Sequence, residues 1–485
     1  MAPPTDGDPQ RWVSLIVVLA AASIIVLDTT IVNVAIPTII RDLDTTLPAA
    51  QWVITGYSLT FASMLVIGGR LGDVYGHRRT FVIGTALFGM GSLLASESWS
   101  VGSLILGEAV IEGLGASLMM PATLAVLSTS FTGRQRATAF AAWGSIVGSA
   151  AALGPLLGGW LTTDYSWRWS FRINVIVAPL AIAGGLLFLP KTKPTGRDEP
   201  LDLGGAALIA SGMFLLVFGL SEGGAYGWWA PLRSFGVAGV GVWPADAPIS
   251  FIPIVFLLAV ATLAGFYRWE RHRAATGRSA LFEFDLLRFL SFRYGLITTT
   301  ITAIGQFGLM FAMALYLQDA RHLTAKQNGL WMLPFGASML ASAPLAGRLV
   351  GRFGAPAVVR SGLVLQTASL VYLGLTVSAT SSFAQVMPGL VGFGFGAGFA
   401  SSQLTSLILS EIPVAKSGVA GGTNSTARQV GAALGIATIG ALVTEQTSVL
   451  AGTRSALFFA AAVLVIGICT SMLIPSHRRT AATVS

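Results

Sequence analysis

The chain has little charge and few residues suited to catalysis. Asp, Glu, Lys and Arg make up only 10% of its 485 residues, whereas 54% are hydrophobic and the mean hydropathy is +0.74. A soluble protein needs about 25% charged residues to cover its surface. Most of this surface must therefore face lipid.

Cysteine and histidine are also scarce, which excludes several classes of site. The single Cys469 forms no disulfide framework and no metal cluster, and the four histidines fall in predicted loops without metal-ligand spacing. No Gly-x-x-x-x-Gly-Lys-Ser/Thr loop occurs that would bind the phosphates of ATP. We therefore expect no metal, no cofactor and no enzymatic activity, and any transport must draw its energy from a gradient.

Long apolar segments are abundant instead. About 20 apolar residues span a bilayer as a helix. The first such stretch is too long for a cleavable signal, so we expect it to be a span. The segments predict an all-α polytopic membrane protein with fourteen transmembrane helices, near residues 13–36, 50–69, 80–98, 101–122, 137–161, 172–190, 203–221, 250–267, 294–317, 329–346, 360–379, 383–408, 426–445 and 455–474.

The positive charges predict the topology. Cytoplasmic loops of membrane proteins are enriched in Lys and Arg. If both termini are cytoplasmic, this helix count places roughly three quarters of the 29 lysines and arginines in the inner loops. The formal net charge of +8 is then a topology signal, and we expect no nucleic-acid partner.

An internal repeat predicts the domain organisation. Residues 69–76 read Gly-Arg-Leu-Gly-Asp-Val-Tyr-Gly, and residues 347–354 read Gly-Arg-Leu-Val-Gly-Arg-Phe-Gly. Repeated halves are common in transporters, with the substrate site at their interface. We predict an N-terminal six-helix half (1–200), an inserted two-helix segment (201–293) and a C-terminal six-helix half (294–485).

Three acids lie inside predicted membrane helices. Asp28 is in the first segment, and Glu108 and Glu112 lie four residues apart in the fourth, on one helix face. Ionisable groups at this depth are costly and are functional by default. Neighbouring buried acids disfavour double ionisation, so such a cluster can bind a proton from one side and release it to the other. The alternatives are a structural hydrogen bond for Asp28 and a solvated position for Glu108.

Other polar and aromatic residues are candidate substrate contacts. Arg428, near the start of the thirteenth segment, either lines the cavity or anchors at the membrane interface. Packing is the alternative for the remaining candidates, which are Tyr57, Trp143, Gln306 and Phe307.

Several motifs in order resemble the major facilitator superfamily. The loop from Gly69 to Arg79 is similar to its inner-loop signature, which forms a charge-based latch; Val74 and His77 replace residues that are usually basic, so a weaker latch is expected. The resemblance implies conformational roles for Gly69, Asp73, Gly76, Arg78 and Arg79, and, through the antiporter signature of the fifth helix, for Gly154, Pro155, Gly158 and Gly159.

The resemblance is closest to the fourteen-helix drug/proton antiporter branch. The run Leu27-Asp28-Thr29-Thr30-Ile31-Val32-Asn33 is similar to its first-helix signature, which adds Asn33 to the substrate candidates. One departure is notable. Ala109 stands where the family carries a fourth-helix arginine, and Glu112 stands where it carries glutamine. A more acidic cavity favours cations, and we expect a glutamate to take over proton coupling.

These observations predict a proton-coupled antiporter that exports hydrophobic, cationic drugs or antibiotics by alternating access. We expect a monomer in the plasma (inner) membrane of a bacterium, with protons, membrane lipids and small amphipathic substrates as its partners. Export of a lipid or an endogenous secondary metabolite is the first alternative. A membrane-embedded enzyme or receptor is the second, although no catalytic constellation supports it.

Overall fold

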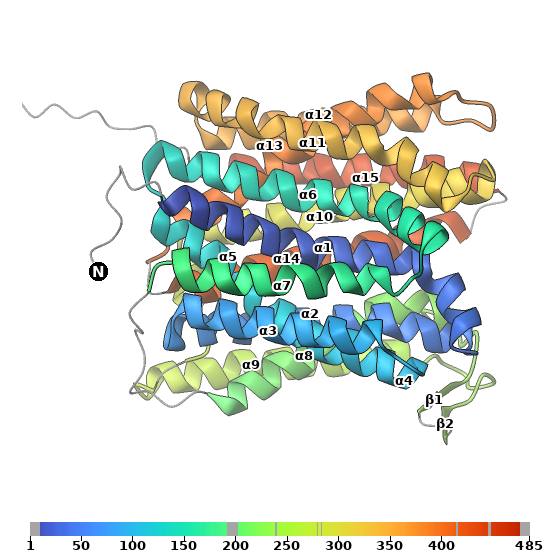
Figure 1. The fold of residues 1–485 in the computed structure, drawn as a ribbon, viewed down its shortest axis with the longest axis horizontal. Helices are drawn as coiled ribbons and strands as arrows, with labels where there is room; N and C mark the ends of the chain where they lie inside the picture. Colours follow the sequence, from blue (N-terminus) through green and yellow to red (C-terminus); the bar gives the residue numbers. More distant parts are fainter. Residues whose placement is uncertain are drawn as a thin grey trace, which may run out of the picture.

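The computed structural model describes residues 10–191, 202–237, 240–278, 280–282, 284–413, 416–444 and 448–475. Within them, long helices lie side by side along the long axis of the molecule (Figure 1). The first helices in the chain are α1 (Gln10–Asp42), α2 (Leu47–Tyr75), α3 (His77–Ser96), α4 (Val101–Leu104), a π-helix (Ile105–Glu112), α5 (Gly113–Ser130), α6 (Gly133–Asp164) and α7 (Trp169–Phe188).

The remaining elements complete the bundle. They are α8 (Leu203–Tyr226), β1 (Phe235–Val237), β2 (Val240–Trp243), α9 (Ile252–Ala275), a 3₁₀ turn (Phe284–Arg288), α10 (Leu290–Leu315), a second π-helix (Tyr316–Ala320), α11 (Ala325–Phe353), α12 (Ala355–Thr376), α13 (Phe383–Ser410), α14 (Ser417–Thr444) and α15 (Val449–Met472). The two strands pair antiparallel and form a small hairpin at one end of the bundle (Figure 1).

The prediction of an all-α polytopic fold is confirmed. Thirteen helical segments of the described residues are long and apolar enough to cross a membrane. The remaining predicted segment is α6, a 32-residue helix that lies among the others (Figure 1). Large apolar side chains such as Leu180, Leu257 and Leu375 are about 70% exposed, as expected of a surface that faces lipid.

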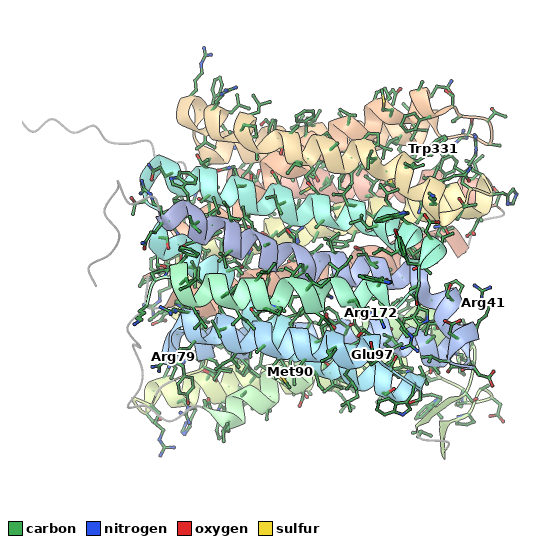
Figure 2. All side chains as sticks on the ribbon, in the orientation of Figure 1. Arg41, Arg79, Met90, Glu97, Arg172 and Trp331 are labelled. Carbon is green, nitrogen blue, oxygen red and sulfur yellow. The ribbon has the colours of Figure 1, made fainter. Side chains whose placement is uncertain are left out.

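The connections alternate between the two ends of the bundle. Arg79, predicted in an inner loop, and Arg41, predicted in an outer loop, lie at opposite ends (Figure 2). We call the end where α2 ends and α14 begins the predicted inner end. The assignment of this end to the cytoplasm stays a prediction.

The two repeated loops share a backbone conformation. Gly76 connects α2 to α3 with φ of 96°, and Gly354 connects α11 to α12 with φ of 83°. This left-handed region suits glycine because it has no Cβ. The last glycine of each repeat therefore allows the sharp reversal between consecutive helices.

The hydrophobic core has two main parts. One is formed mostly by helices before α10, including α8 and α9, and the other by α10 to α15. The α8–α9 pair packs on itself, and α8 also contacts both α2 and α14. Near the end of α8, the hydroxyl of Thr55 on α2 donates to Glu222 at 3.3 Å. The predicted boundary near residue 200 lies outside the described residues, and the division into halves stays a prediction.

Candidate functional site

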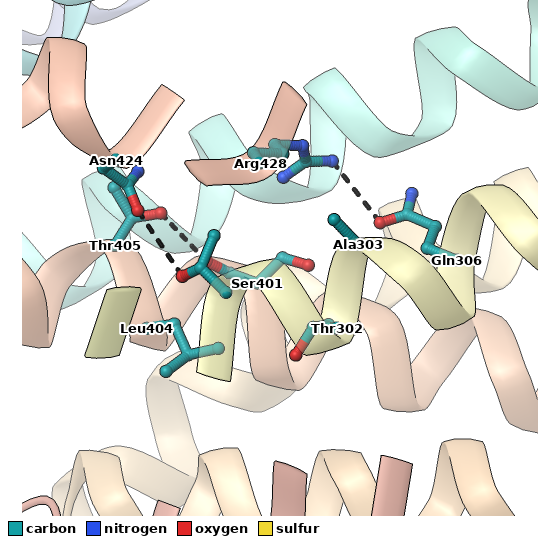
Figure 3. Close-up of a pocket in the computed structure, with 9 residues that line it drawn as sticks. Thr302, Ala303, Gln306, Ser401, Leu404, Thr405, Asn424 and Arg428 are labelled. Atoms are coloured by element: carbon teal, nitrogen blue, oxygen red, sulfur yellow. Dashed lines mark hydrogen bonds between the residues drawn. The ribbon is translucent and has the colours of Figure 1, made fainter. Parts of the chain in front are cut away.

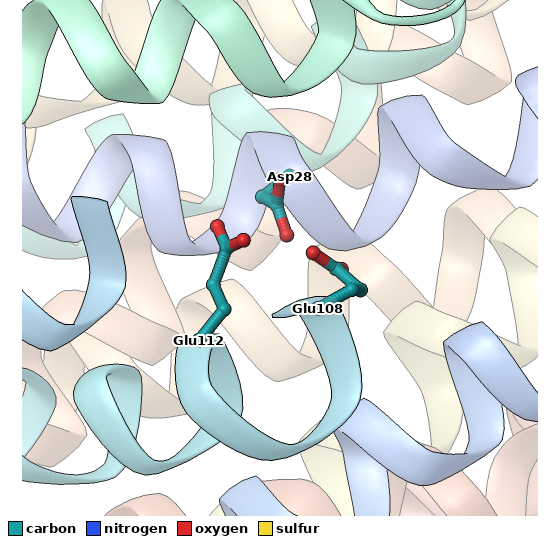
Figure 4. A group of neighbouring side chains, drawn as sticks. All are labelled: Asp28, Glu108 and Glu112. Carbon is teal, nitrogen blue, oxygen red and sulfur yellow. The ribbon is translucent and has the colours of Figure 1, made fainter. Parts of the chain in front are cut away.

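Three carboxyl groups meet in the interior of the first helices. Asp28 on α1 and Glu108 and Glu112 on the first π-helix are each at most 1% exposed. One oxygen of each lies within 4.8 Å of the others, and the three side chains converge in Figure 4. Burial of Glu108 removes the alternative of a solvated position. We call these residues the acid cluster.

The fourth span is locally a π-helix where it carries the two glutamates. Residues 105–112 adopt this conformation. It is rare in proteins overall, and where it occurs it is often at a functional site. Close packing against α3 accompanies it, since a Cβ on Gly91 would lie 2.6 Å from the Glu112 nitrogen and from the Gly107 oxygen. The sequence predicted that Glu108 and Glu112 share one helix face. It predicted an ordinary α-helix there rather than a π-helix.

Asn174 on α7 links two members of the acid cluster. Its Nδ2 donates to Oδ1 of Asp28 at 2.7 Å and to Oε1 of Glu112 at 3.0 Å. Both hydrogens of the amide are thereby used. We did not predict this residue from the sequence. Its signal is a lone amide in an otherwise apolar span, which is less conspicuous than an acid.

The acid cluster lacks a compensating positive charge. Among the residues that the structure describes, no Lys, Arg or His forms an ion pair with Asp28, Glu108 or Glu112, and one oxygen of each has no hydrogen-bond partner. Three buried, adjacent carboxylates cannot all remain ionised without compensation. Bound protons, or a hard cation that accepts oxygen ligands, supply that compensation.

The position of the family's usual arginine is tightly packed. Ala109 is 1% exposed, and a Cβ on Gly56 of α2 would lie 2.8 Å from its Cβ. Tyr57, which follows Gly56 on α2, is also 1% exposed, and its hydroxyl has no hydrogen-bond partner among the described residues. The carbonyl of Tyr57 lies beside Gly113, directly after Glu112. Tyr57 therefore lies at the depth of the acid cluster.

Two of the predicted substrate contacts come together elsewhere. Arg428 on α14 donates to Oε1 of Gln306 on α10 at 3.4 Å, and both line a polar cavity (Figure 3). Phe307, the neighbour of Gln306, is half-buried and does not line this cavity. The structure therefore connects two of the predicted contacts in the last helices.

The other two predicted contacts engage their own surroundings. Trp143 is buried and donates to Oγ1 of Thr123 at 3.3 Å, which favours its packing alternative. Asn33 is exposed and donates to the carbonyl of Thr29 in its own helix at 2.6 Å. A substrate role for either residue stays a prediction.

The loop signature connects the end of α2 to the start of α14 at the predicted inner end. The two carboxylate oxygens of Asp73 on α2 accept hydrogen bonds from the backbone nitrogens of Gly418 and Val419, at 2.8 and 2.9 Å. These nitrogens lie in the first turn of α14, where N–H groups have no partner within the helix and a negative charge is stabilised. Gly69 and Gly418 bring the helices together, since a Cβ on Gly69 would lie 2.3 Å from the Gly418 oxygen. We call these contacts the inner latch.

His77, Arg78 and Arg79 of the signature have different surroundings. His77 is buried with its Nε2 3.5 Å from an Asp73 oxygen, and Arg78 donates to the carbonyl of Leu186 at the end of α7. Arg79 is exposed at the end of the bundle (Figure 2). The predicted weakness of the latch stays a prediction.

The glycines of the fifth-helix signature let α6 contact two neighbours. A Cβ on Gly154 would lie 1.8 Å from Oγ1 of Thr30, and one on Gly158 would lie 2.9 Å from the Ile31 oxygen, both on α1. Gly159 faces Lys326 at the start of α11. The side chain of Pro155 lies outside the described residues, so its predicted role stays a prediction.

Known proteins resemble this chain over most of its length. The model of the Major Facilitator Superfamily matches residues 18–436 and 296–484. A tetracenomycin C resistance and export protein of Streptomyces glaucescens is 31% identical, over 90% of this chain and 76% of its own. A puromycin resistance protein of Streptomyces alboniger is 32% identical, over 91% and 83%.

A solved structure has the same fold. The human organic anion transporter MFSD10 superposes with a TM-score of 0.64 and 14% identity, over 96% of this chain and all of that one. At this identity the likeness concerns the fold alone. Taken with the family model and the relatives, it leads to one conclusion: the chain belongs to the Major Facilitator Superfamily.

Proposed function

We propose that this protein exports hydrophobic, mainly cationic drugs or antibiotics across a bacterial plasma membrane in exchange for protons. Relatives named for resistance to puromycin and for export of tetracenomycin C support the export of such compounds. The acid cluster carries the proton-coupling part of the proposal. Asp28, Glu108 and Glu112 are buried together in spanning helices, and no Lys, Arg or His among the described residues forms an ion pair with them.

The coupling follows from the cost of leaving these carboxyls charged. When the cluster opens to the outside, it binds protons that neutralise it before it is enclosed again. When it opens to the inside, a cationic substrate lowers the cost of ionisation and promotes proton release. Asn174 holds Asp28 and Glu112 in one hydrogen-bonded unit, which makes proton binding at one depend on the other.

Alternating access requires two closed arrangements of the helices. The inner latch, in which Asp73 of α2 contacts the start of α14, supports a state whose inner end is closed. The glycine contacts of α6 with α1 and α11 support small relative movements, because these positions of α6 carry no side chain of their own. In this proposal the protein acts as a monomer surrounded by lipid, with both termini in the cytoplasm, and performs no covalent catalysis.

A proton gradient supplies enough energy for this cycle. One pH unit provides about 1.36 kcal/mol per proton, and 100 mV provides about 2.3 kcal/mol per charge moved. Exchange of one proton for a monovalent cation is electroneutral and uses the pH gradient alone. Export of a neutral compound uses both contributions.

The proposal is tested with Glu112→Gln in proteoliposomes that contain a pH-sensitive dye. Glutamine retains the size of the side chain and an oxygen that accepts from Asn174, but it cannot release a proton. We expect proton movement on addition of ethidium to fall to near the protein-free level. Glu97→Gln is the control, since Glu97 is exposed and pairs with Arg172 at 3.0 Å (Figure 2). Unchanged coupling in Glu112→Gln would remove Glu112 from the mechanism.

A second candidate function is the export of one endogenous metabolite. One relative is named for both resistance to and export of a single compound, tetracenomycin C. In the same proteoliposomes, transport of several structurally unrelated cations supports a multidrug exporter. Transport confined to one compound class supports the second candidate.

A further inference from the structure

A small polar cavity of about 10 Å³, with room for about one water molecule or one oxygen atom of a ligand, lies between α10, α13 and α14. Hydroxyl, amide and guanidinium groups surround it (Figure 3). Its polar lining consists mainly of Thr302 and Gln306 on α10, Ser401 and Thr405 on α13, and Asn424 and Arg428 on α14. No Asp or Glu is part of this lining.

The hydrogen bonds inside the cavity use its amide oxygens. Oε1 of Gln306 accepts from Arg428 at 3.4 Å, and Oδ1 of Asn424 accepts from the hydroxyl of Thr299 at 3.5 Å. The hydroxyl hydrogens of Thr302 and Thr405 are donated to carbonyls of their own helices. These bonds leave N–H donors of Gln306 and Arg428 available, while each hydroxyl oxygen keeps lone pairs that accept.

Gln306 shows this surplus of donors directly. The residue is 1% exposed, yet its Nε2 has no hydrogen-bond partner among the described residues. A buried donor without a partner is costly, at about 1–3 kcal/mol. A site that leaves such a donor unpaired is suited to a ligand that brings an acceptor.

Arg428 adds a fixed positive charge to the same cavity. In the part of the chain that the structure describes, no carboxylate forms an ion pair with it. A guanidinium remains charged at physiological pH and matches the geometry of a carboxylate with two parallel N–H groups. The missing partner is therefore an anionic or strongly accepting oxygen.

Arg428 lies on α14, which packs along α2, the helix whose Tyr57 lies beside the acid cluster. Gly418 contacts Gly69, and Gly422 contacts Leu65, so α14 rises along α2 by four residues at each step. The carbonyl of Tyr57, eight residues before Leu65, lies beside Gly113 next to Glu112, and Arg428 lies six residues after Gly422. Tyr57 and Arg428 therefore both lie beyond the contact between Gly422 and Leu65, away from the predicted inner end.

We propose that this cavity binds an acceptor group of the exported molecule, a carboxylate or a similar anionic oxygen, while the cationic part of that molecule lies toward the acid cluster. The proposal rests on the proposed export function and narrows its substrates to amphipathic molecules with a basic centre and an anionic oxygen. In this proposal the acid cluster exchanges protons for the basic centre of the substrate. Arg428 and Gln306 bind the anionic oxygen at the other end of the same molecule.

Two phosphonium cations of nearly equal size test this proposal. Carboxybutyl-triphenylphosphonium carries a carboxylate where pentyl-triphenylphosphonium carries a methyl group. We expect the purified protein in detergent to bind the carboxylate probe about tenfold more tightly by calorimetry, the effect of one charged hydrogen bond. Gln306→Met and Arg428→Gln should each reduce this ratio to near one.

Gln366→Met is the matched control. Gln366 on α12 is also fully buried with one amide atom unpartnered, but it does not line the cavity. It should retain the wild-type ratio. Equal binding of both probes by the wild-type protein overturns the cavity proposal, whereas export remains supported if both cations are transported. If neither probe is bound or transported, the proposed export function itself fails.

Discussion

The first six helices and the last six share a loop conformation but differ in their chemistry. Gly76 and Gly354 both end a repeated loop with positive φ. In the first loop Asp73 contacts α14, whereas Gly351 occupies the corresponding position in the second. The buried polar groups differ as well, with carboxyls in the first set and the Arg428 cavity in the last.

This difference assigns two tasks to two sides of the molecule. Carboxyl groups gain and lose protons, whereas a guanidinium cannot be deprotonated in proteins. In the proposed cycle, proton exchange takes place in the first helices, and Arg428 of the last helices contributes a constant positive charge. If both the first and the last helices carried groups that gain and lose protons, each substrate would be coupled to a variable number of protons.

The largest effect that we expect comes from breaking the acid cluster at Asn174. Asn174→Leu leaves one oxygen of Asp28 and one of Glu112 without their donor. We expect the free energy of unfolding to fall by about 1–3 kcal/mol. Thermal unfolding of the purified protein in detergent, followed by intrinsic fluorescence, measures this loss.

Asn33→Leu is the control for this substitution. Asn33 is exposed and bonds only within its own helix, so we expect a change below about 0.5 kcal/mol. Equal unfolding temperatures for Asn174→Leu and Asn33→Leu would show that the amide does not hold the acid cluster together. The distinction between the two sides would then rest on the carboxyls alone.

Most of the fold could be predicted from the sequence because its signals are local. Apolar runs of about 20 residues define spanning helices, and glycines mark the reversals between them. The π-helix at residues 105–112 was not predictable, because it coincides with close packing of Gly91 on α3 against Glu112. This packing partner lies on another helix, so no pattern within the segment indicates it.

The candidate site was predictable only in part for the same reason. Acids inside apolar helices are conspicuous, so Asp28, Glu108 and Glu112 were found. Asn174 gains its importance only from the two acids that it contacts. The partner of Asp73 lies 345 residues away in the chain, and no local pattern in the sequence connects them.

A second test compares the same glycine of the two repeats. A Cβ on Gly69 would lie 2.3 Å from the Gly418 oxygen, whereas one on Gly347 would make only an ordinary contact with Thr138 at 3.5 Å. Gly69→Ala should therefore prevent full closure of the inner latch, and Gly347→Ala should be tolerated. Overpacking at such contacts typically costs about 1–3 kcal/mol.

A cysteine at position 417 reports the closure. Ser417 is buried at the start of α14 in the closed arrangement, and Cys469 is replaced by serine to remove the background. We expect Gly69→Ala to raise the rate of labelling by a membrane-impermeant maleimide in inverted vesicles about tenfold. Equal rates for Gly69→Ala and Gly347→Ala would mean that the two repeats contribute alike to closure.

The smallest effect is expected from the charge of Asp73. Asparagine keeps one accepting oxygen for the first turn of α14 but loses the negative charge and one of the two hydrogen bonds. A charge at a helix N-terminus contributes about 0.3–1 kcal/mol, so Asp73→Asn should raise the labelling rate of the same cysteine about two- to fivefold. Gly351→Asp, which introduces the acid into the second repeat, should leave the rate unchanged because Gly351 is exposed. A rate in Asp73→Asn equal to wild type would mean that the glycine contacts alone close the inner end. Asp73 would then be part of the first repeat without contributing to the difference between the first helices and the last.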